Sequence, residues 1–262
     1  MNRYLSTVGL YARWNLYKIL TIILITALAA GFLVYRYPIG TVVLDENYVS
    51  AETGETTQLV ASYPKLEGVV SGSGAPVVCA AGFAAIVAVM SRTGCGYGVK
   101  TEYTIRRLRV KERQAVLLWA AYHAVLLVIY WAVLAAVLYG VMHLRLQMDV
   151  PVDYFVYTYG PQSMMLLCYT DTFLHHLLPL RDVAAWGVGI ASVLAAALST
   201  VLFSYRQRRG SFSVMVLLAL AGTIGSFFCG LGENANALLM VLLLGVAGAA
   251  FVMLIGGDKD AA

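Results

Sequence analysis

The sequence predicts an all-α polytopic membrane protein with six transmembrane helices, and three observations lead to this fold class. Of its 262 residues, 60% are hydrophobic and only 12% are charged, whereas an ordinary soluble domain has about 45–50% apolar and about 25% charged residues. The mean hydropathy is +0.77. The apolar residues form continuous runs of helical length, whereas the strands of a membrane barrel alternate apolar and polar residues. These observations exclude a soluble domain.

Six apolar runs are long enough to cross a hydrocarbon core, which takes roughly 20 helical residues. Within a single transmembrane domain of residues 1–262, we predict spans at about 19–35, 75–91, 115–142, 183–205, 211–231 and 237–256. Residues 1–18 precede the first run and combine apolar positions at helical spacing with basic and aromatic side chains. This pattern predicts a helix lying on the inner membrane surface. A frayed tail with anchoring aromatic side chains is the alternative.

The basic residues predict the orientation, because Lys and Arg are retained on the cytoplasmic side of a membrane. With both termini in the cytoplasm, fourteen of the eighteen Lys and Arg residues fall inside. We therefore expect a multi-pass protein of the cell (plasma) membrane with two large external segments, residues 36–74 and 143–182. In the first segment, residues 41–44 and 57–60 could pair as a small hairpin. In the second, residues 162–178 predict an external amphipathic or re-entrant helix.

The cytoplasmic segment 92–114 holds seven of the eighteen basic residues. Gly94, Gly96 and Gly98 give it a flexible start, and a short helix is predicted to follow from Lys100. A phosphate-binding P-loop needs Gly directly before Lys, but Val99 intervenes here. We therefore expect no ATP site in this chain.

This layout resembles the ABC-2-type permeases, the membrane subunits of ATP-binding-cassette transporters. The resemblance depends on the N-terminal interfacial helix, the large external loop after the first span, and the stretch EYTIRRLRVKERQ at residues 102–114. In that family the corresponding stretch holds a coupling helix and then a hydrophobic-x-hydrophobic-x-basic lead, which Leu108, Val110 and Arg113 match loosely, with the basic residue one place late. The chain departs from the family at Arg109, where proline is frequent, and in the length of segment 143–182.

The resemblance implies a permease subunit that is not itself an enzyme and that exports a peptide, lipid-like or amphipathic substrate. Its implied partners are two copies of an ABC ATP-binding subunit, a second permease subunit of the same or a different kind, and the lipid bilayer, with no nucleic acid. No cofactor would be bound directly, since ATP and Mg would be held by the ATPase partner. The coupling residues it implies are Lys100, Glu102, Tyr103, Ile105, Arg106 and Arg107.

Polar side chains inside the predicted spans are candidates for lining a substrate path. They are Thr21, Thr26, Tyr122, His123, Tyr130, Ser192, Ser199, Thr200, Thr223 and Ser226. Apart from the tyrosines and Cys79, His123 is the only ionisable side chain well inside a span, and such residues are functional candidates by default. A neutral histidine bonded to the backbone of a neighbouring helix is the structural alternative.

Two other classes of function stay open. One is a non-transporting membrane scaffold or sensor protein. The other is an intramembrane enzyme using Asp171, His175 and His176, together with Asp182, although no metal site is predicted because no H-E-x-x-H motif or second ligand cluster is present. Cys168 and Cys229 both fall on the predicted outer side, where either a disulfide or two separate thiols would be compatible with the sequence.

Overall fold

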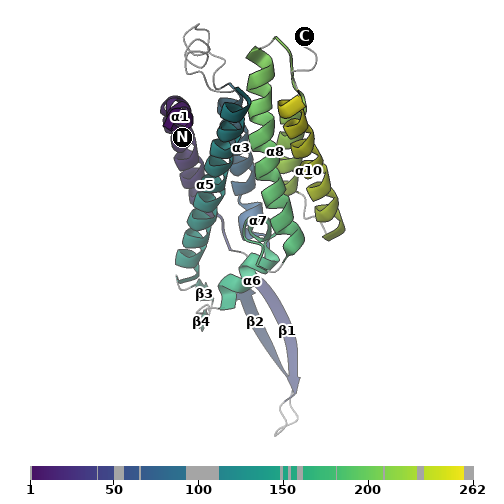
Figure 1. Ribbon diagram of the computed structural model, residues 1–262. Helices are drawn as coiled ribbons and strands as arrows, with labels where there is room; N and C mark the ends of the chain where they lie inside the picture. The colour runs from purple at the N-terminus through teal and green to yellow at the C-terminus, as the bar shows by residue number, and fades with distance from the viewer. Residues whose placement is uncertain are drawn as a thin grey trace.

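A helical bundle with a β-hairpin projecting from one end is the architecture of the computed structural model (Figure 1). The structure describes residues 2–39, 41–49, 56–64, 66–92, 112–147, 150–152, 155–157, 162–180, 182–208, 210–228 and 233–256. The bundle consists of α1 (Asn2–Arg36), α3 (Ala75–Ser91), α5 (Glu112–Gln147), α8 (Val183–Arg208), α9 (Met215–Phe228) and α10 (Glu233–Gly256). We call the end that carries the hairpin the hairpin end.

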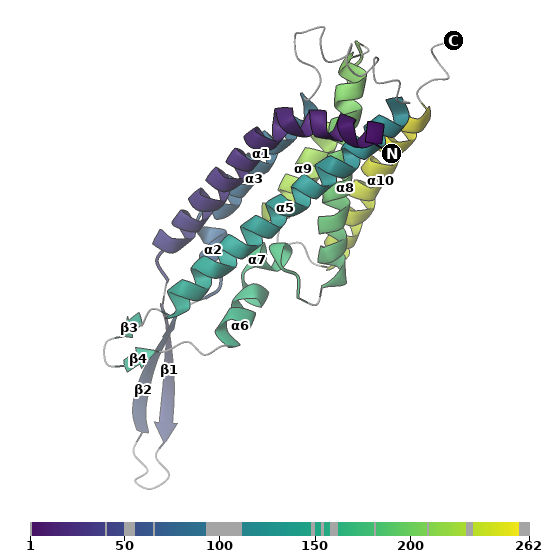
Figure 2. The same cartoon turned by 60° about the vertical axis from the view of Figure 1, so that its left-hand side comes forward.

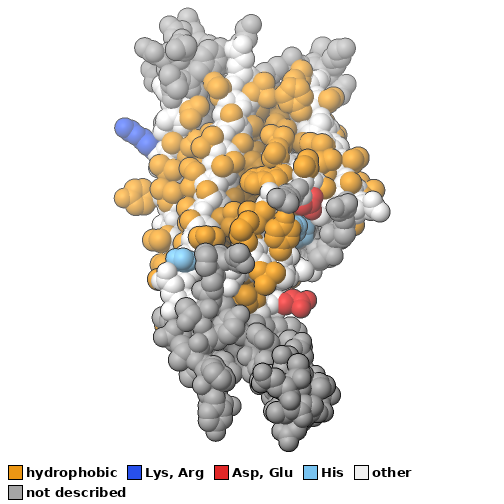
Figure 3. Space-filling model, turned by 90° about the horizontal axis from the view of Figure 1, so that it is seen from below, with side chains coloured by type: hydrophobic (Ala, Val, Ile, Leu, Met, Phe, Trp, Pro, Cys, Tyr) orange, Lys and Arg blue, Asp and Glu red, His pale blue; other side chains and the backbone are white. Residues whose placement is uncertain are grey.

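Four of these helices are long and apolar enough to cross a membrane, which makes the chain a helical multi-pass membrane protein. They span residues 15–36, 114–147, 183–208 and 234–256. Their outward surface is apolar: along α1, for example, Leu24, Leu28 and Phe32 are each more than half exposed and follow one another at helical spacing. Figure 3 shows the described surface from the hairpin end, with hydrophobic side chains over most of it. A surface of this kind is suited to lipid and not to water.

The other two apolar helices, α3 and α9, are shorter than a full span. They have 17 and 14 residues, which correspond to about 25 and 21 Å against a hydrocarbon core of about 30 Å. The bounds predicted for α3 are those observed, whereas α9 begins at Met215 because residues 211–214 are not helical. Near the hairpin end, α2 (Val69–Gly72) precedes α3, and α7 (Thr172–Leu177) packs against α9. Four of the six predicted spans therefore correspond to helices long enough to cross a membrane, and the two at α3 and α9 stay predictions.

Helix α1 is continuous from Asn2 to Arg36, but it bends. Figure 2 shows its first part lying across the end of the bundle opposite the hairpin, and the rest descending along α3 and α5. At the hairpin end of α1, Arg145 Nη1 of α5 donates to the carbonyl oxygens of Val34, at 2.8 Å, and of Tyr37. A cation at these last carbonyls is favourable because they carry the negative end of the helix dipole.

The predicted hairpin is confirmed and is longer than expected. Strands β1 (Thr41–Val49) and β2 (Thr56–Pro64) pair antiparallel, with Leu44 opposite Ala61. A second pair, β3 (Val150–Val152) and β4 (Phe155–Tyr157), was not predicted. The helix expected over residues 162–178 is instead two helices, α6 (Gln162–Thr170) and α7, which are broken at Asp171. Asp171 is the N-cap of α7.

Candidate functional site

The Asp171 carboxylate lies completely buried where the segment between α1 and α3 meets the segment between α5 and α8. Its Oδ1 accepts hydrogen bonds from the backbone N–H groups of Phe173 and Leu174, both at 3.1 Å, and so caps the first turn of α7. Its Oδ2 accepts from the N–H groups of Val70 and Ser71 in α2, at 2.8 and 2.9 Å. Four backbone donors therefore replace the water that a carboxylate loses on burial.

This pattern accounts for the broken helix. An aspartate at an N-cap has an extended backbone, and Asp171 has φ −85° and ψ 117°. The chain therefore leaves helical conformation at this residue and starts a new helix, whose Phe173 and Leu174 are buried in the bundle. The Phe173 ring packs edge-on against Phe227 of α9, with ring centroids 5.7 Å apart. As a result, α7 is held inside the hairpin end and does not lie along its surface.

His175 and Asp182 form a second, more exposed contact on the same side. The Nε2 atom of His175 lies 3.7 Å from Oδ2 of Asp182, and their side chains are 26% and 18% exposed. Asp182 also caps α8, because its Oδ1 accepts from the N–H groups of Ala184 and Ala185 at 2.8 and 3.1 Å. The contact therefore joins the end of α7 to the start of α8.

These positions bear on the alternative of an enzyme using Asp171, His175 and His176. Both oxygens of Asp171 are occupied by backbone donors, so this carboxylate has a structural role and is not placed to act on a substrate. Within the part of the chain that the structure describes, no group of three His, Cys, Asp or Glu side chains could hold a metal ion. The arrangement therefore favours structural roles for Asp171 and Asp182.

His123 lies fully buried between α5 and α8, where its Nδ1 is 3.0 Å from the Thr200 hydroxyl oxygen. That hydroxyl donates its single proton to the Ala197 carbonyl at 2.9 Å, so it can only accept from His123 and the proton is assigned to Nδ1. Nε2 is buried without a hydrogen-bond partner among the described residues. His123 therefore bonds the side chain of Thr200 on the neighbouring helix α8. The structural role considered from the sequence was a bond to a backbone group of a neighbouring helix.

The other predicted path residues are spread over several interfaces. Tyr130 donates its hydroxyl to the Cys79 carbonyl and joins α5 to α3. Ser199, Thr223 and Ser226 are buried and donate to carbonyls one turn back in their own helices. The Tyr122 hydroxyl is buried with no partner among the residues described. The described contacts of these residues do not bring them together on one surface. Their role in a substrate path stays a prediction.

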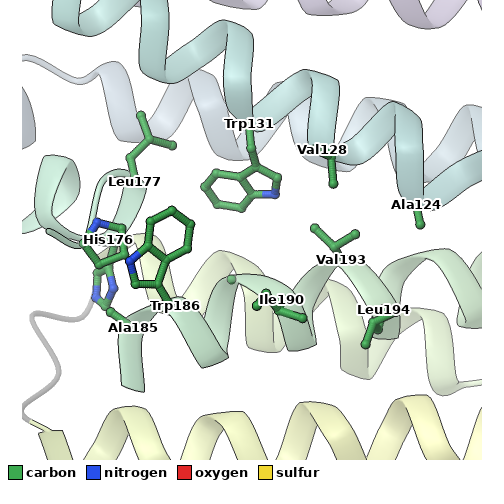
Figure 4. Close-up of a pocket in the computed structure, with 12 residues that line it drawn as sticks. Ala124, Val128, Trp131, His176, Leu177, Ala185, Trp186, Ile190, Val193 and Leu194 are labelled. Carbon is green, nitrogen blue, oxygen red and sulfur yellow. The ribbon is translucent and has the colours of Figure 1, made fainter. Parts of the chain in front are cut away.

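A lateral groove follows the seam between α5 and α8, and sequence analysis did not identify it. Figure 4 shows Ala124, Val128 and Trp131 on α5 facing Ala185, Trp186, Ile190, Val193 and Leu194 on α8, with His176 and Leu177 at one end. The groove has a volume of about 380 Å³ and includes Gly189 and Pro179 in its lining. The apolar residues on each helix predicted a buried or lipid-facing side, but their sequence carries no signal that the two helices separate here.

Some of the residues singled out from the sequence lie outside the described part of the chain. They are Cys229 and the predicted coupling residues Lys100, Glu102, Tyr103, Ile105, Arg106 and Arg107. Cys168 of α6 is a buried free thiol. Burial raises the pKa of this thiol, and the nearby negative charge of Asp171 raises it further. Between a disulfide and a separate thiol at Cys168, the structure has the separate thiol.

Comparison of the chain with known protein families, with curated proteins and with solved structures gives no significant match.

Proposed function

We propose that this chain is the permease subunit of an ABC transporter of the ABC-2 type. In this proposal two such subunits, each crossing the plasma membrane six times, form the path, and two copies of a separate ATPase subunit supply the energy. Both termini and segment 93–111 would be cytoplasmic, and the hairpin would be external. The substrate would be a peptide, lipid-like or amphipathic molecule, moved outward.

One observation supports this proposal above the others. Helix α3 ends and α5 begins at the end of the bundle opposite the hairpin, and the first part of α1 lies across that same end (Figure 2). The basic segment 93–111 is therefore anchored on both sides at this end. A partner that pushed on it would act directly on α3 and α5, which are rigid helices able to transmit the motion.

The groove and the closed hairpin end add support of a different kind. Helices α2 and α7 fill the hairpin end of the bundle around α3, α8 and α9, so a path would have to open there during transport. The apolar lining of the α5–α8 groove favours an amphipathic cargo over an inorganic ion.

Partner binding tests the proposal directly. The chain would be purified in mild detergent from its own cells, and co-purifying proteins identified by mass spectrometry. We expect an ABC ATPase, and we expect Tyr103→Ala and Arg106→Glu to weaken its association by on the order of 1–3 kcal/mol, since Tyr and Arg are frequent at the centres of interfaces.

Arg206→Glu is the matched control, because it makes the same charge change in the last turn of α8, outside segment 93–111. If Arg206→Glu were as damaging as Arg106→Glu, the effect would be general electrostatics and not docking. If no ATPase co-purified, or both coupling variants kept full binding and ATP hydrolysis, the permease proposal would fail and the scaffold or sensor alternative would replace it.

A further inference from the structure

We propose that the α5–α8 groove is a binding site for one hydrocarbon chain of a membrane lipid in the leaflet at the hairpin end. The groove is concave, partly open and lined mostly by apolar side chains. Val128, Trp186 and Ile190 on its walls are each more than half exposed. This site requires only that the chain lie in a bilayer, so it is independent of the proposed transport function.

The length of the groove matches one leaflet. From Ala124 to Trp131 on α5, and from Ala185 to Leu194 on α8, the helical rise gives about 10 and 13 Å. Half of a hydrocarbon core of about 30 Å is roughly 15 Å. The groove begins near the start of α8, at Ala185, and ends at Leu194, near the middle of this helix. Along α8 the groove therefore extends from near the hairpin end of the helix to about its middle, a distance close to the thickness of one leaflet.

The lining of the groove is suited to a hydrocarbon chain. Val128, Ile190 and Val193 present aliphatic side chains, and His176 is the one ionisable side chain among the described residues that line the groove. A lipid tail in contact with this lining gains dispersion energy along its length. Cross-linking at Ile190 distinguishes it from the competing occupant, a second copy of the chain.

The two ends of the groove differ in the way an amphiphile requires. At the inner end, the hydrogen bond between His123 and Thr200 joins α5 to α8 beyond Ala124 and Leu194. At the hairpin end lie His176 and the indole ring of Trp186 (Figure 4), which are side chains suited to the polar boundary of a bilayer. A lipid bound here would place its tail at Ala124 and its polar group beside His176.

Gly189 offers a way to fill the groove without disturbing the protein. A Cβ atom added at this glycine meets no heavy atom within 4 Å, so the first side-chain atom of Gly189→Leu meets no clash. Gly248→Leu on α10 is the matched control, because Gly248 has the same freedom but does not line the groove. Leucine favours a helix more than glycine does, so both variants should fold.

Quenching by brominated lipid tests the site. The protein would carry Trp131 as its only tryptophan, with phenylalanine at positions 14, 119 and 186, in phosphatidylcholine vesicles containing phosphatidylcholine brominated at mid-chain. We expect strong quenching of Trp131, loss of most of that quenching in Gly189→Leu, and no change in Gly248→Leu. Val128→Phe narrows the groove from α5 and should act like Gly189→Leu. A version with Val252→Trp as sole tryptophan, on the exposed side of α10, should be quenched equally in every variant.

Two results would overturn the proposal. One is quenching of Trp131 that is unaffected by Gly189→Leu and Val128→Phe, since the lipid would then reach this ring without entering the groove. The other is a lack of quenching in the unsubstituted groove together with a disulfide-linked dimer of Ile190→Cys in a background without native cysteines. This second result would mean that a second copy of the chain covers the groove.

Discussion

Asp171 and Val70 are joined by a hydrogen bond of 2.8 Å from the Val70 N–H to Asp171 Oδ2, across 101 positions of sequence. This bond connects α2, which precedes the short helix α3, to α7, which packs on the short helix α9. Both short helices therefore end at a structure organised by one carboxylate. Because each oxygen of Asp171 bonds a different helix, neither helix can move away without leaving buried donors or a buried charge without partners.

Loss of the Asp171 carboxylate should destabilise the protein strongly. Asp171→Ala removes the α7 cap, which is worth about 1 kcal/mol, and leaves buried N–H groups in α2 unpaired, at about 1–3 kcal/mol each. We expect a loss on the order of 3 kcal/mol or more in the free energy of unfolding. Asp171→Asn keeps one accepting oxygen and should lose less. Unfolding of the purified protein in mixed micelles by SDS titration measures both.

Asp182→Ala is the control for this prediction, since it also removes an N-cap but from a partly exposed site at the start of α8. It should cost only about 1 kcal/mol. An Asp171→Ala variant no less stable than Asp182→Ala would show that the bonds to α2 contribute nothing.

The Cys168 thiol should react slowly with maleimide. Its pKa is raised by burial and by Asp171, so at neutral pH it holds less of the reactive thiolate than an ordinary cysteine. In a background without the other native cysteines, labelling should increase only as the pH rises beyond the ordinary thiol pKa of about 8.5. Met165→Cys, with Cys168 also replaced, places a thiol on an exposed position of the same helix and should label rapidly at pH 7. Equal rates at pH 7 would contradict the burial of Cys168.

The α1–α3 contact should tolerate no side chain at Gly82. A Cβ atom at Gly82 would overlap the Thr26 side chain of α1, and overpacking of this kind costs typically about 1–3 kcal/mol. Gly82→Val should therefore lower the unfolding free energy, and Thr26→Ala should restore part of it in the double variant. Gly140→Val, at a helical glycine with open space around its Cβ position, is the control. Similar losses at Gly82 and Gly140 would indicate a general effect of valine and not of close packing.

The orientation of the chain can be tested with cysteines on opposite ends of the bundle. Glu55→Cys lies in the segment between β1 and β2, and Gln207→Cys lies at the other end, in the last turn of α8. In a background without native cysteines, a membrane-impermeant maleimide applied to intact cells should label position 55 and leave position 207 unlabelled. Labelling of both after lysis confirms that each thiol is accessible. The reverse pattern in intact cells would show that the hairpin faces the cytoplasm.

The long helices were predictable because apolar length is a local property of sequence. The starts of α3 and α8, at Ala75 and Val183, coincide with the predicted bounds. The hairpin was also predictable, since residues 41–44 and 57–60 contain several β-branched residues and flank a polar segment. By contrast, the break at Asp171 was not predicted. The N-cap itself is local, but the same carboxylate also bonds α2, about a hundred residues away. Local periodicity cannot distinguish a polar interruption on a surface helix from a cap shared with a distant segment.

The candidate site was predictable in its residue types but not in its geometry. His123 stood out as an ionisable group inside an apolar run, and the structure has it buried in a specific hydrogen bond. The groove could not be predicted because it depends on where α5 and α8 separate, which is a property of the pair of helices. Trp131 and Trp186 face each other across it (Figure 4), although neither sequence position differs from an ordinary membrane tryptophan.

The bond between His123 and Thr200 distinguishes a structural from a functional role for this histidine. Thr200→Val removes the accepting oxygen and keeps the shape, so both ring nitrogens of His123 would lack partners, whereas Thr200→Ser keeps the oxygen. In membrane proteins the coupling energy of such a pair averages about 0.6 and reaches about 1.7 kcal/mol. We expect a double-mutant cycle of His123→Leu and Thr200→Val to give a value in this range, with Thr200→Ser close to wild type.

If the chain transports as proposed, activity measured in the same variants decides between the roles. If His123 only packs, transport should follow stability, and the double variant His123→Leu with Thr200→Val should recover because no buried polar group is left unpaired. If the Nε2 atom serves the substrate path, His123→Leu should stop transport while the unfolding free energy stays near wild type, and Thr200→Val should not restore it. Among the described residues, Nε2 is fully buried without a hydrogen-bond partner, and an acceptor left unpaired costs about 1–3 kcal/mol. Full transport by His123→Leu would remove this residue from the path.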